Sequence, residues 1–247
     1  MYTREILKRD LEQMGLCPTD TILIHSSMKA IGDVEGRADG VLDALLDFFA
    51  PGLLVFPTLS WTVAEADPPV FDVRRTKSIV GILPELFRGR PGVVRSLHPT
   101  HSVAAAGTDA NWITSEDHLN HSPCGKRSAW HKLLERDARI LMVGCDLTRC
   151  TFLHGVEEWA DIPGRLAPRV RFTAIDENGA AHTVESSPHQ GVPSDQFWKA
   201  EAALRAAGAL RDGQFGDAKV MVLTAKKTAE TVYNLLYRDP ELFSEEA

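Results

Sequence analysis

Three polar side chains, two of which can perform acid–base chemistry, follow an apolar run in the segment ILMVGCDLTRCTFLHGVEE, residues 140–158. The pattern places Thr151, His154 and Glu157 in the first turns of a predicted helix. His154 and Glu157 are three positions apart, so on a helix their side chains leave from the same face. A carboxylate beside an imidazole orients the ring and favours its protonated form, which suits a general base. An isolated H-x-x-E more often marks a helix with one hydrogen-bonded histidine and one solvated glutamate, and only the rest of the chain favours catalysis.

Alternating strand-like and helix-like segments position these residues and favour an α/β fold. Short apolar or β-branched runs predict strands at 21–25, 53–56, 102–106, 140–143, 170–175 and 219–223. Helical spacing predicts helices at 3–14, 41–49, 79–88, 128–136, 195–207 and 225–237. The runs 172–175 and 182–184 flank an Asp-Glu-Asn-Gly turn and predict a hairpin, so we expect a mixed sheet flanked by helices. No linker divides residues 1–247, and we expect a single domain.

Composition and charge limit the class of protein. The chain of 247 residues has a net charge of −7 and no basic stripe that could neutralise phosphates, which argues against a nucleic-acid partner. No apolar run approaches the ~20 residues that span a bilayer, and the charged start does not resemble a signal peptide. The four cysteines lack C-x-x-C spacing. We therefore expect a protein of the reducing cytoplasm, away from membranes. Its acidic surface would suit a cationic small substrate and equally suits solubility alone.

Two polar loops at expected strand ends could bind a ligand, because α/β proteins usually place ligands there. In HSSMKAIG, the hydroxyl groups of Ser26 and Ser27 and the following amides could hold a phosphate, with Lys29 as counter-charge. A serine-capped turn explains the same residues. In residues 95–102, RSLHPTHS, the guanidinium of Arg95 could contact a phosphate bidentately. A polar loop held by its own hydroxyl groups is the alternative for this segment.

Metal and covalent chemistry are weaker interpretations of the sequence. The pairs His98/His101 and His118/His121 each have an i, i+3 spacing, yet no H-E-x-x-H motif or grouped cysteine and acid accompanies them. We therefore expect no metal. Cys150 precedes the predicted helix, so a covalent acyl-enzyme on this cysteine stays open as an alternative. An inert buried cysteine is the commoner role of such a residue.

The polar segments occur in an order and spacing that resembles one known family. From the amino end they read H-S-S-x-x-x-I-G, F-P-T, R-S-x-H-P-x-x-S, P-C-G-x-x-S-x-x-x-L and L-x-V-G-(x6)-T-F-L-H-x-x-E. This set is similar to the antibiotic N-acetyltransferases, typified by the aminoglycoside 3-N-acetyltransferases. The resemblance extends from residues 3–7 to residues 212–219, and the third and fifth motifs are its most specific parts.

The resemblance implies a specific fold, reaction and co-substrate. The fold would be the α/β arrangement of this family, distinct from the larger acetyltransferase superfamily whose pyrophosphate loop reads Q/R-x-x-G-x-G/A. The reaction would transfer acetyl from acetyl-CoA to an amine of an aminoglycoside or similar small antibiotic, by direct attack on the thioester. His154 would be the base, Glu157 its orienting partner, and Thr151 would lie near the thioester. The CoA-binding loops would contain Ser26, Ser27, Arg95, Ser96, His98 and Ser102, with Lys29 as the counter-charge.

The acceptor amine is less well defined by the sequence. Trp61 could line its pocket, and Asp67, Asp72 and Asp161 are candidates for recognising an ammonium group, although solvated surface aspartates are commoner. The stretch FDVRRTKS, residues 71–78, lacks both prolines usual in the family and carries three cations, so a strongly cationic aminoglycoside is less assured. A CoA-binding protein that acts on another amine, or on none, is a further alternative. A homodimer is an open option for its assembly.

Overall fold

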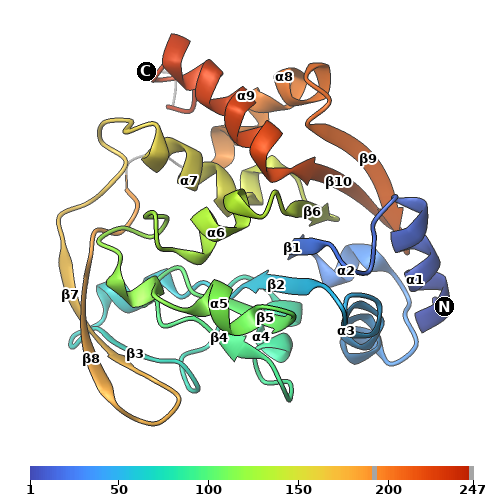
Figure 1. The fold of residues 1–247 in the computed structure, drawn as a ribbon, viewed down its shortest axis with the longest axis horizontal. Coiled ribbons are helices and arrows are strands. Elements are labelled where there is room, and N and C mark those ends of the chain that lie inside the picture. Colours follow the sequence, from blue (N-terminus) through green and yellow to red (C-terminus); the bar gives the residue numbers. More distant parts are fainter. Residues whose placement is uncertain (191–193, 245–247) are drawn as a thin grey trace.

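The computed structural model describes residues 1–190 and 194–244. Its main element is a seven-stranded sheet in the order β4-β5-β2-β1-β6-β10-β9 (Figure 1). β1 runs parallel to β2 and β6, and the other neighbouring strands are antiparallel. The predicted mixed sheet is therefore confirmed. Its strands are β1 Thr21–Ser26, β2 Leu53–Pro57, β4 Val94–Arg95, β5 Val103–Gly107, β6 Arg139–Val143, β9 Leu210–Phe215 and β10 Ala218–Thr224.

Helices cover both faces of this sheet, because successive residues of its central strands point to opposite sides. Leu23 and Met142 belong to one apolar core, whereas Ile22 and Leu141 belong to the other. The first core packs under α5 Ala110–Thr114, α6 Ala129–Glu135, α7 Thr151–Trp159, α8 Glu201–Ala206 and α9 Ala225–Arg238. The second packs under α1 Arg4–Gln13, α2 Met28–Ile31, α3 Arg37–Phe48 and α4 Ile82–Phe87.

Among the described residues, no helix combines the length and the apolar character needed to cross a bilayer.

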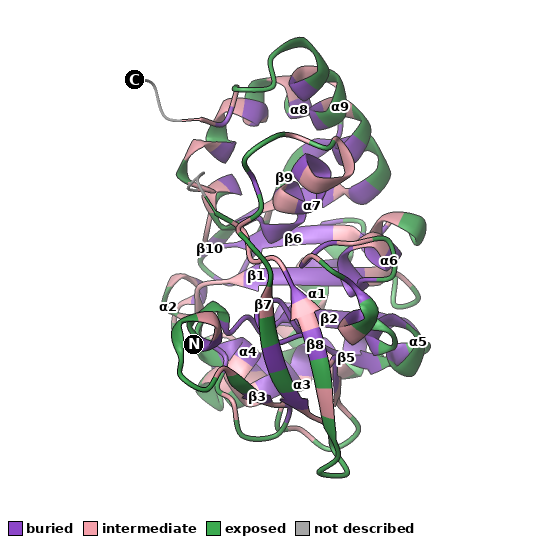
Figure 2. Cartoon of the chain, turned by 90° about the vertical axis from the view of Figure 1, so that its left-hand side faces the viewer, coloured by how far each residue is buried: buried purple, intermediate pink, exposed green. Residues whose placement is uncertain are grey.

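A three-stranded sheet lies beside the main one and contains the predicted hairpin. In its order β3-β7-β8, β3 Val70–Asp72 is parallel to β7 Val170–Ile175, and β8 Ala181–Ser186 is antiparallel to β7. Phe71 and Phe172 form the centre of a small third core on its inner face. Figure 2 shows the hairpin across the front of the molecule, with an exposed tip.

Several short elements differ from the prediction. Helix α4 begins at Ile82 because Gly81, with φ of 118°, has a backbone conformation that suits glycine and no regular helix. The predicted helix at 195–207 is divided between a 3₁₀ helix and α8. Strand β9, with the sequence LRDGQF, escapes prediction because it carries two charged residues and a glycine at the edge of the sheet. The 3₁₀ helices are η1 Trp61–Glu65, η2 Asp117–Leu119, η3 Leu147–Arg149 and η4 Ser194–Ala200.

Gly144 ends β6 and starts the turn that leads through η3 into α7. Its φ of 66° lies in the left-handed region, which glycine adopts at little cost. A Cβ at this position would also collide with the Cβ of Ala30 in α2. The close approach of these two segments therefore fixes where α7 begins relative to the end of β1.

Gly144→Ala is expected to destabilise the protein by about 2–5 kcal/mol, because left-handed strain of about 1–2 kcal/mol adds to overpacking of about 1–3 kcal/mol. Gly179→Ala is the matched control, since Gly179 has φ of 83° but an added Cβ would meet no atom of the described residues within 4 Å. Only the backbone strain applies there. Urea unfolding of both variants measures the difference in free energy of unfolding, and equal losses would contradict the close approach at Gly144.

Candidate active site

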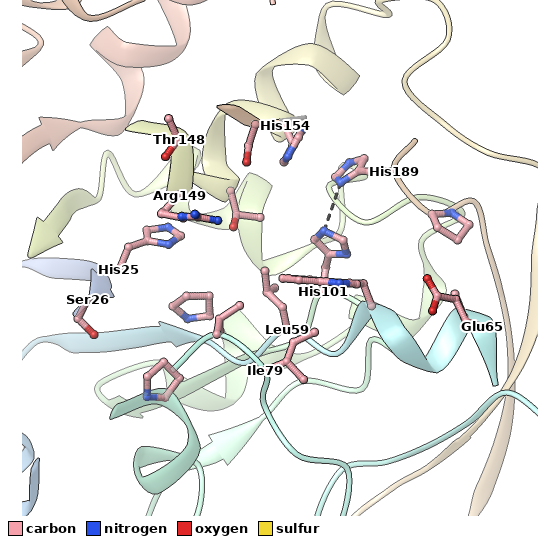
Figure 3. A pocket seen from close by; sticks show the side chains of 18 of the residues that line it. His25, Ser26, Leu59, Glu65, Ile79, His101, Thr148, Arg149, His154 and His189 are labelled. Carbon is pink, nitrogen blue, oxygen red and sulfur yellow. Dashed lines mark hydrogen bonds between the residues drawn. The ribbon is translucent and has the colours of Figure 1, made fainter. Parts of the chain in front are cut away.

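A cavity of about 980 Å³ lies at the carboxyl ends of β1 and β2, next to the first turn of α7. Ligands of α/β proteins usually bind at this edge of a sheet. Figure 3 shows side chains from both sides converging on it, with His25 and Ser26 from β1 and His154 from α7. The polar residues that line the cavity are His25, Ser26, Ser27, Glu65, His101, Thr148, Arg149, Thr151, His154, His189 and Ser194.

Helix α7 presents two of its side chains to the cavity while its opposite face packs into the core. Phe152, Leu153 and Val156 form that buried face, as the apolar spacing in TFLHGVEE predicts. These buried side chains fix the rotation of the helix about its axis. The structure therefore brings Thr151 and His154 to the same cavity.

A hydrogen bond to a buried carboxylate holds the imidazole of His154 in place. Nδ1 of His154 lies 3.1 Å from Oε2 of Glu157, whose side chain is only 1% exposed. The other oxygen, Oε1, accepts a hydrogen bond of 2.7 Å from Nε of Arg165. Arg165 in turn donates to the carbonyl oxygen of Pro240 at 3.3 Å and to Oγ of Ser244 at 3.4 Å. With Nδ1 donating to Glu157, Nε2 of His154 is the nitrogen that can accept a proton.

Two further rings enclose the imidazole of His154. The ring of His189 stacks on it at 4.7 Å between centroids with 29° between planes, and Phe197 packs edge-on at 4.7 Å. Burial lowers the pKa of both His189 and His101 well below the usual value for histidine. These two neighbouring imidazoles are therefore neutral near pH 7 and add no positive charge beside His154.

Of the residues expected to bind CoA, Ser26 and Ser27 line the cavity, and Lys29 is exposed outside that lining. Nε2 of His25 and Oγ of Ser26 have no hydrogen-bond partner among the described residues. Arg149 contributes a guanidinium to the same part of the cavity wall, near His25 (Figure 3). This end of the cavity thus combines hydroxyl groups with a cation, a set that suits an anionic ligand.

Arg95 lies outside the cavity lining, and its guanidinium is used within the protein. Nε donates to Oγ1 of Thr58 and to Oγ of Ser102, each at 3.1 Å, while the terminal nitrogens donate to the carbonyl oxygens of Thr58 at 2.8 Å and Thr76 at 2.6 Å. The guanidinium carbon also lies 4.8 Å from the ring centroid of Phe71. Burial lowers the pKa of Arg95 to about 9. Arg95 therefore joins the 95–102 loop to the segments that contain Thr58 and Thr76.

The other polar residues of the 95–102 loop also stabilise the loop itself. Oγ of Ser96 accepts from the amide of Val103 at 3.0 Å, and Nδ1 of His98 accepts from the amide of His101 at 3.0 Å. Oγ of Ser102 donates to the carbonyl oxygen of Thr58 at 2.9 Å. Ser96, His98 and Ser102 are fully buried and lie outside the cavity lining. These hydrogen bonds match the alternative of a polar loop held by its own hydroxyl groups. The loop places His101 in the cavity lining.

The residues expected to recognise the acceptor are spread over the surface. Trp61 lines the cavity, whereas Asp67 and Asp161 are exposed outside its lining. Oδ1 of Asp72 accepts the amides of residues 74 and 75 at 2.9 and 3.0 Å, so this carboxylate stabilises a turn. Among the described lining residues, Glu65 supplies the carboxylate.

Sequence reasoning missed several residues that shape the site. His25 immediately precedes the serine pair, and this adjacency was a usable signal. Glu65, Arg149, Arg165 and His189 come from separate segments that only the fold brings together, so no local spacing marks them.

The thiol of Cys150 is poorly placed for covalent catalysis. Cys150 is completely buried and is absent from the cavity lining among the described residues. Burial raises the pKa of this thiol to about 12. Since the thiolate is the nucleophile, a thiol with this pKa is almost entirely unreactive near pH 7.

Removal of Arg165 should destabilise the protein, because the carboxylate of Glu157 is buried. Arg165→Met is expected to destabilise the protein by about 3–5 kcal/mol, because it leaves a buried carboxylate without its cation. Arg171→Met is the matched control: Arg171 pairs with Glu185 at 2.9 Å, but its side chain is 76% exposed, and such pairs contribute roughly 0–1 kcal/mol. Urea unfolding at pH 7 compares the two, and a similar small loss in both would contradict the buried pair.

The sequence is similar to those of known acetyltransferases. The family profile described as aminoglycoside 3-N-acetyltransferase matches residues 23–237. Aminoglycoside N(3)-acetyltransferase VII of Streptomyces paromomycinus is 31% identical over 259 aligned positions, which cover 92% of this chain and 89% of the relative.

Solved structures share the fold over nearly the whole chain. The structure described as AAC-IIIb in binary complex with CoASH has a TM-score of 0.84 at 28% identity and covers 100% of this chain and 99% of its own. A histidine-to-alanine variant of aminoglycoside acetyltransferase AAC(3)-IVa, in complex with a gentamicin, has a TM-score of 0.84 at 25% identity, with 99% and 92% covered. The chain therefore belongs to the aminoglycoside 3-N-acetyltransferase family and has the α/β fold of that family.

Proposed function

We propose that the protein transfers the acetyl group of acetyl-CoA to an amine of an aminoglycoside or a similar small antibiotic, with His154 as general base. The observation that carries this proposal is the imidazole of His154 in the cavity wall, tied through Nδ1 to Glu157 and through Glu157 to Arg165. The related structures with CoASH and with a gentamicin support the choice of both substrates.

The chemistry requires a base because an alkylamine, with a pKa of ~10, is protonated at neutral pH and cannot attack a thioester. In the proposed reaction Nε2 of His154 takes the ammonium proton and passes it to solvent. It then accepts a second proton as the neutral amine nitrogen bonds to the thioester carbon. The C–S bond of the tetrahedral intermediate then breaks, and the leaving thiolate receives the proton from Nε2. The carboxylate of Glu157 stabilises the imidazolium between these two transfers.

Thr151 is the proposed donor to the oxyanion of the tetrahedral intermediate. It is the first residue of α7 and lines the cavity with His154. The amino-terminal turn of a helix also carries unpaired amide donors and a partial positive charge. A hydroxyl group at this position can therefore stabilise negative charge that develops on the carbonyl oxygen.

The two substrates are proposed to enter from opposite sides of His154. Figure 3 shows Ser26 and Arg149 on one side of His154 and Glu65 on the other. Ser26, Ser27 and Arg149 would contact the anionic CoA, because they supply hydroxyl groups and a cation. Glu65 and Trp61 would contact the acceptor, since a carboxylate and an aromatic face both attract an ammonium group. The buried Arg95, Ser96, His98 and Ser102 would support these contacts through the loop that they shape.

His154→Ala is expected to lower kcat by roughly 10²–10⁴-fold, since it removes the proton acceptor, while CoA affinity is retained. Release of free thiol from acetyl-CoA, measured with a panel of aminoglycosides and simpler amines, gives the rate and identifies the acceptor. His182→Ala is the control, because His182 forms an imidazole–carboxylate pair with Asp176 at 2.8 Å on the hairpin, away from the cavity lining. A fully active His154→Ala enzyme would refute the proposed base.

Thr151→Val is expected to lower kcat by roughly 10²–10³-fold, the usual cost of losing one oxyanion donor. The KM for acetyl-CoA should change little, because the donor acts on the intermediate more than on the bound thioester. Thr148→Val should have a much smaller effect, since the hydroxyl group of Thr148 already donates to Oδ1 of Asp146 at 2.5 Å. Steady-state kinetics measures kcat and KM of both variants. Equal losses of kcat would indicate that Thr151 acts only through the shape of the cavity and would contradict its role as a donor.

A further inference from the structure

Three side chains of types that bind transition metals meet behind the wall of the cavity. Cys124 comes from the loop between η2 and α6, Glu158 from α7, and His189 from the segment after β8. One ligand atom from each, namely a thiol sulfur, a carboxylate oxygen and a ring nitrogen, lies within 4.8 Å of the other two. Sequence spacing gives no hint of this group because its members are 34 and 31 positions apart.

We propose that Cys124, Glu158 and His189 bind a Zn²⁺ ion. Thiolate, imidazole and carboxylate groups are the usual protein ligands of zinc, and a thiolate disfavours harder ions such as Mg²⁺ and Ca²⁺. Three protein ligands leave one tetrahedral position for a water molecule. The ion replaces the proton of the Cys124 thiol and the proton shared by Nε2 of His189 and Oε1 of Glu158, and both protons leave to solvent.

The distances within the group are compatible with such an ion after small side-chain movements. Ligand atoms around tetrahedral zinc are separated by about 3.3–3.7 Å, given metal–ligand bonds of about 2.0–2.3 Å. Nε2 of His189 lies 2.5 Å from Oε1 of Glu158, so these two groups would separate by about 1 Å to admit the ion. The side chains of both are largely buried, at 12% and 5% exposed.

Neighbouring groups hold the proposed ligands in place. The amide of Cys124 donates to Oε1 of Glu158 at 2.9 Å, and its carbonyl oxygen accepts from Nε1 of Trp159 at 2.7 Å. The backbone of the cysteine is therefore fixed against α7. Gly155 leaves room for the ring of Trp159, because a Cβ at this position would lie 2.9 Å from that ring.

The hydrogen bonds of His189 leave the required nitrogen for the metal. Nδ1 of His189 lies 3.2 Å from Nε2 of His101, as the dashed line in Figure 3 shows, and Nδ1 of His101 lies 2.9 Å from Oγ1 of Thr100. With each Nδ1 donating along this chain, Nε2 of His189 is the nitrogen available to the ion, which would replace its hydrogen bond to Oε1 of Glu158. Metal-binding histidines usually donate their second ring N–H in this way. Nδ1 of His98 cannot serve as a further metal ligand, because it accepts hydrogen bonds from two backbone amides.

The site has a consequence for the candidate active site, because His189 stacks on the imidazole of His154. An ion bound to His189 would tie three segments, the 120–128 loop, α7 and the segment after β8, into one rigid wall. The metal would thus hold the ring against which His154 packs, without contact to the reacting atoms.

Metal content of the full-length protein tests the proposal directly. Protein treated with a chelator is reconstituted with one equivalent of Zn²⁺, passed through a desalting column and analysed by mass spectrometry of the metal. Co²⁺ is then used as a spectroscopic probe, because a thiolate ligand gives it a charge-transfer band in the near ultraviolet. The variants are Cys124→Ser and His189→Gln, with Cys150→Ser as the control for another fully buried cysteine. Circular dichroism verifies that each variant is folded.

We expect the wild-type protein and Cys150→Ser to retain one equivalent of Zn²⁺ and to show the cobalt–thiolate band. Cys124→Ser should lose the band, and both ligand variants should bind Zn²⁺ at least ~100-fold more weakly. His101→Phe keeps all three ligands and removes only the partner of Nδ1, so it should weaken binding by about 10–100-fold. Wild-type protein without stoichiometric Zn²⁺, or a Cys124→Ser variant that retains the band, would overturn the proposal. Neither result bears on acetyl transfer, which is measured separately.

Discussion

The buried carboxylate of Glu157 is the constraint around which the site is organised. A carboxylate at 1% exposure has lost its hydration and must be compensated by charge and hydrogen bonds within the protein. Arg165 compensates one oxygen and His154 engages the other. Arg165 is itself held by Pro240 and Ser244 near the carboxyl end of the chain. The position of His154 therefore depends on α7, on the loop after it and on the segment that follows α9.

The same arrangement leaves His154 one free direction. Glu157 occupies Nδ1, His189 covers one face of the ring, and Phe197 packs edge-on against it. Nε2 is left to face the cavity. A ring restrained on these sides loses little freedom when it accepts a proton, which is what positioning contributes to general-base catalysis.

Much of the fold could be predicted from the sequence because it depends on local periodicity. The apolar runs at β1, β2 and β6 and the Asn-Gly turn between β7 and β8 specify strands and a hairpin by themselves. The pair of His154 and Glu157 was visible for the same reason, since an i, i+3 spacing on a helix determines a shared face. Edge strands such as β9 were not predicted, because charged residues and glycine obscure the alternation of apolar and polar residues.

The rest of the site could not be predicted because it depends on contacts between distant segments. Arg165, His189 and Cys124 acquire their neighbours only through the packing of α7 against two loops. The 95–102 loop shows the reverse case: its polar residues suggested ligand contacts, yet Arg95 and Ser102 form hydrogen bonds within the protein. Residue type indicates which hydrogen bonds a side chain can make, and only the fold determines whether a ligand or the chain itself makes them.

In the proposed mechanism, the carboxylate of Glu157 gives His154 its basic role in direct acetyl transfer. Thiol release at saturating substrate concentrations by Glu157→Gln tests it most directly, because the amide keeps the shape of the side chain and removes its charge. A fall in kcat on the order of 10²-fold or more, with unchanged affinity for acetyl-CoA, is the result that the proposed mechanism predicts. A kcat equal to that of the unaltered protein would contradict it.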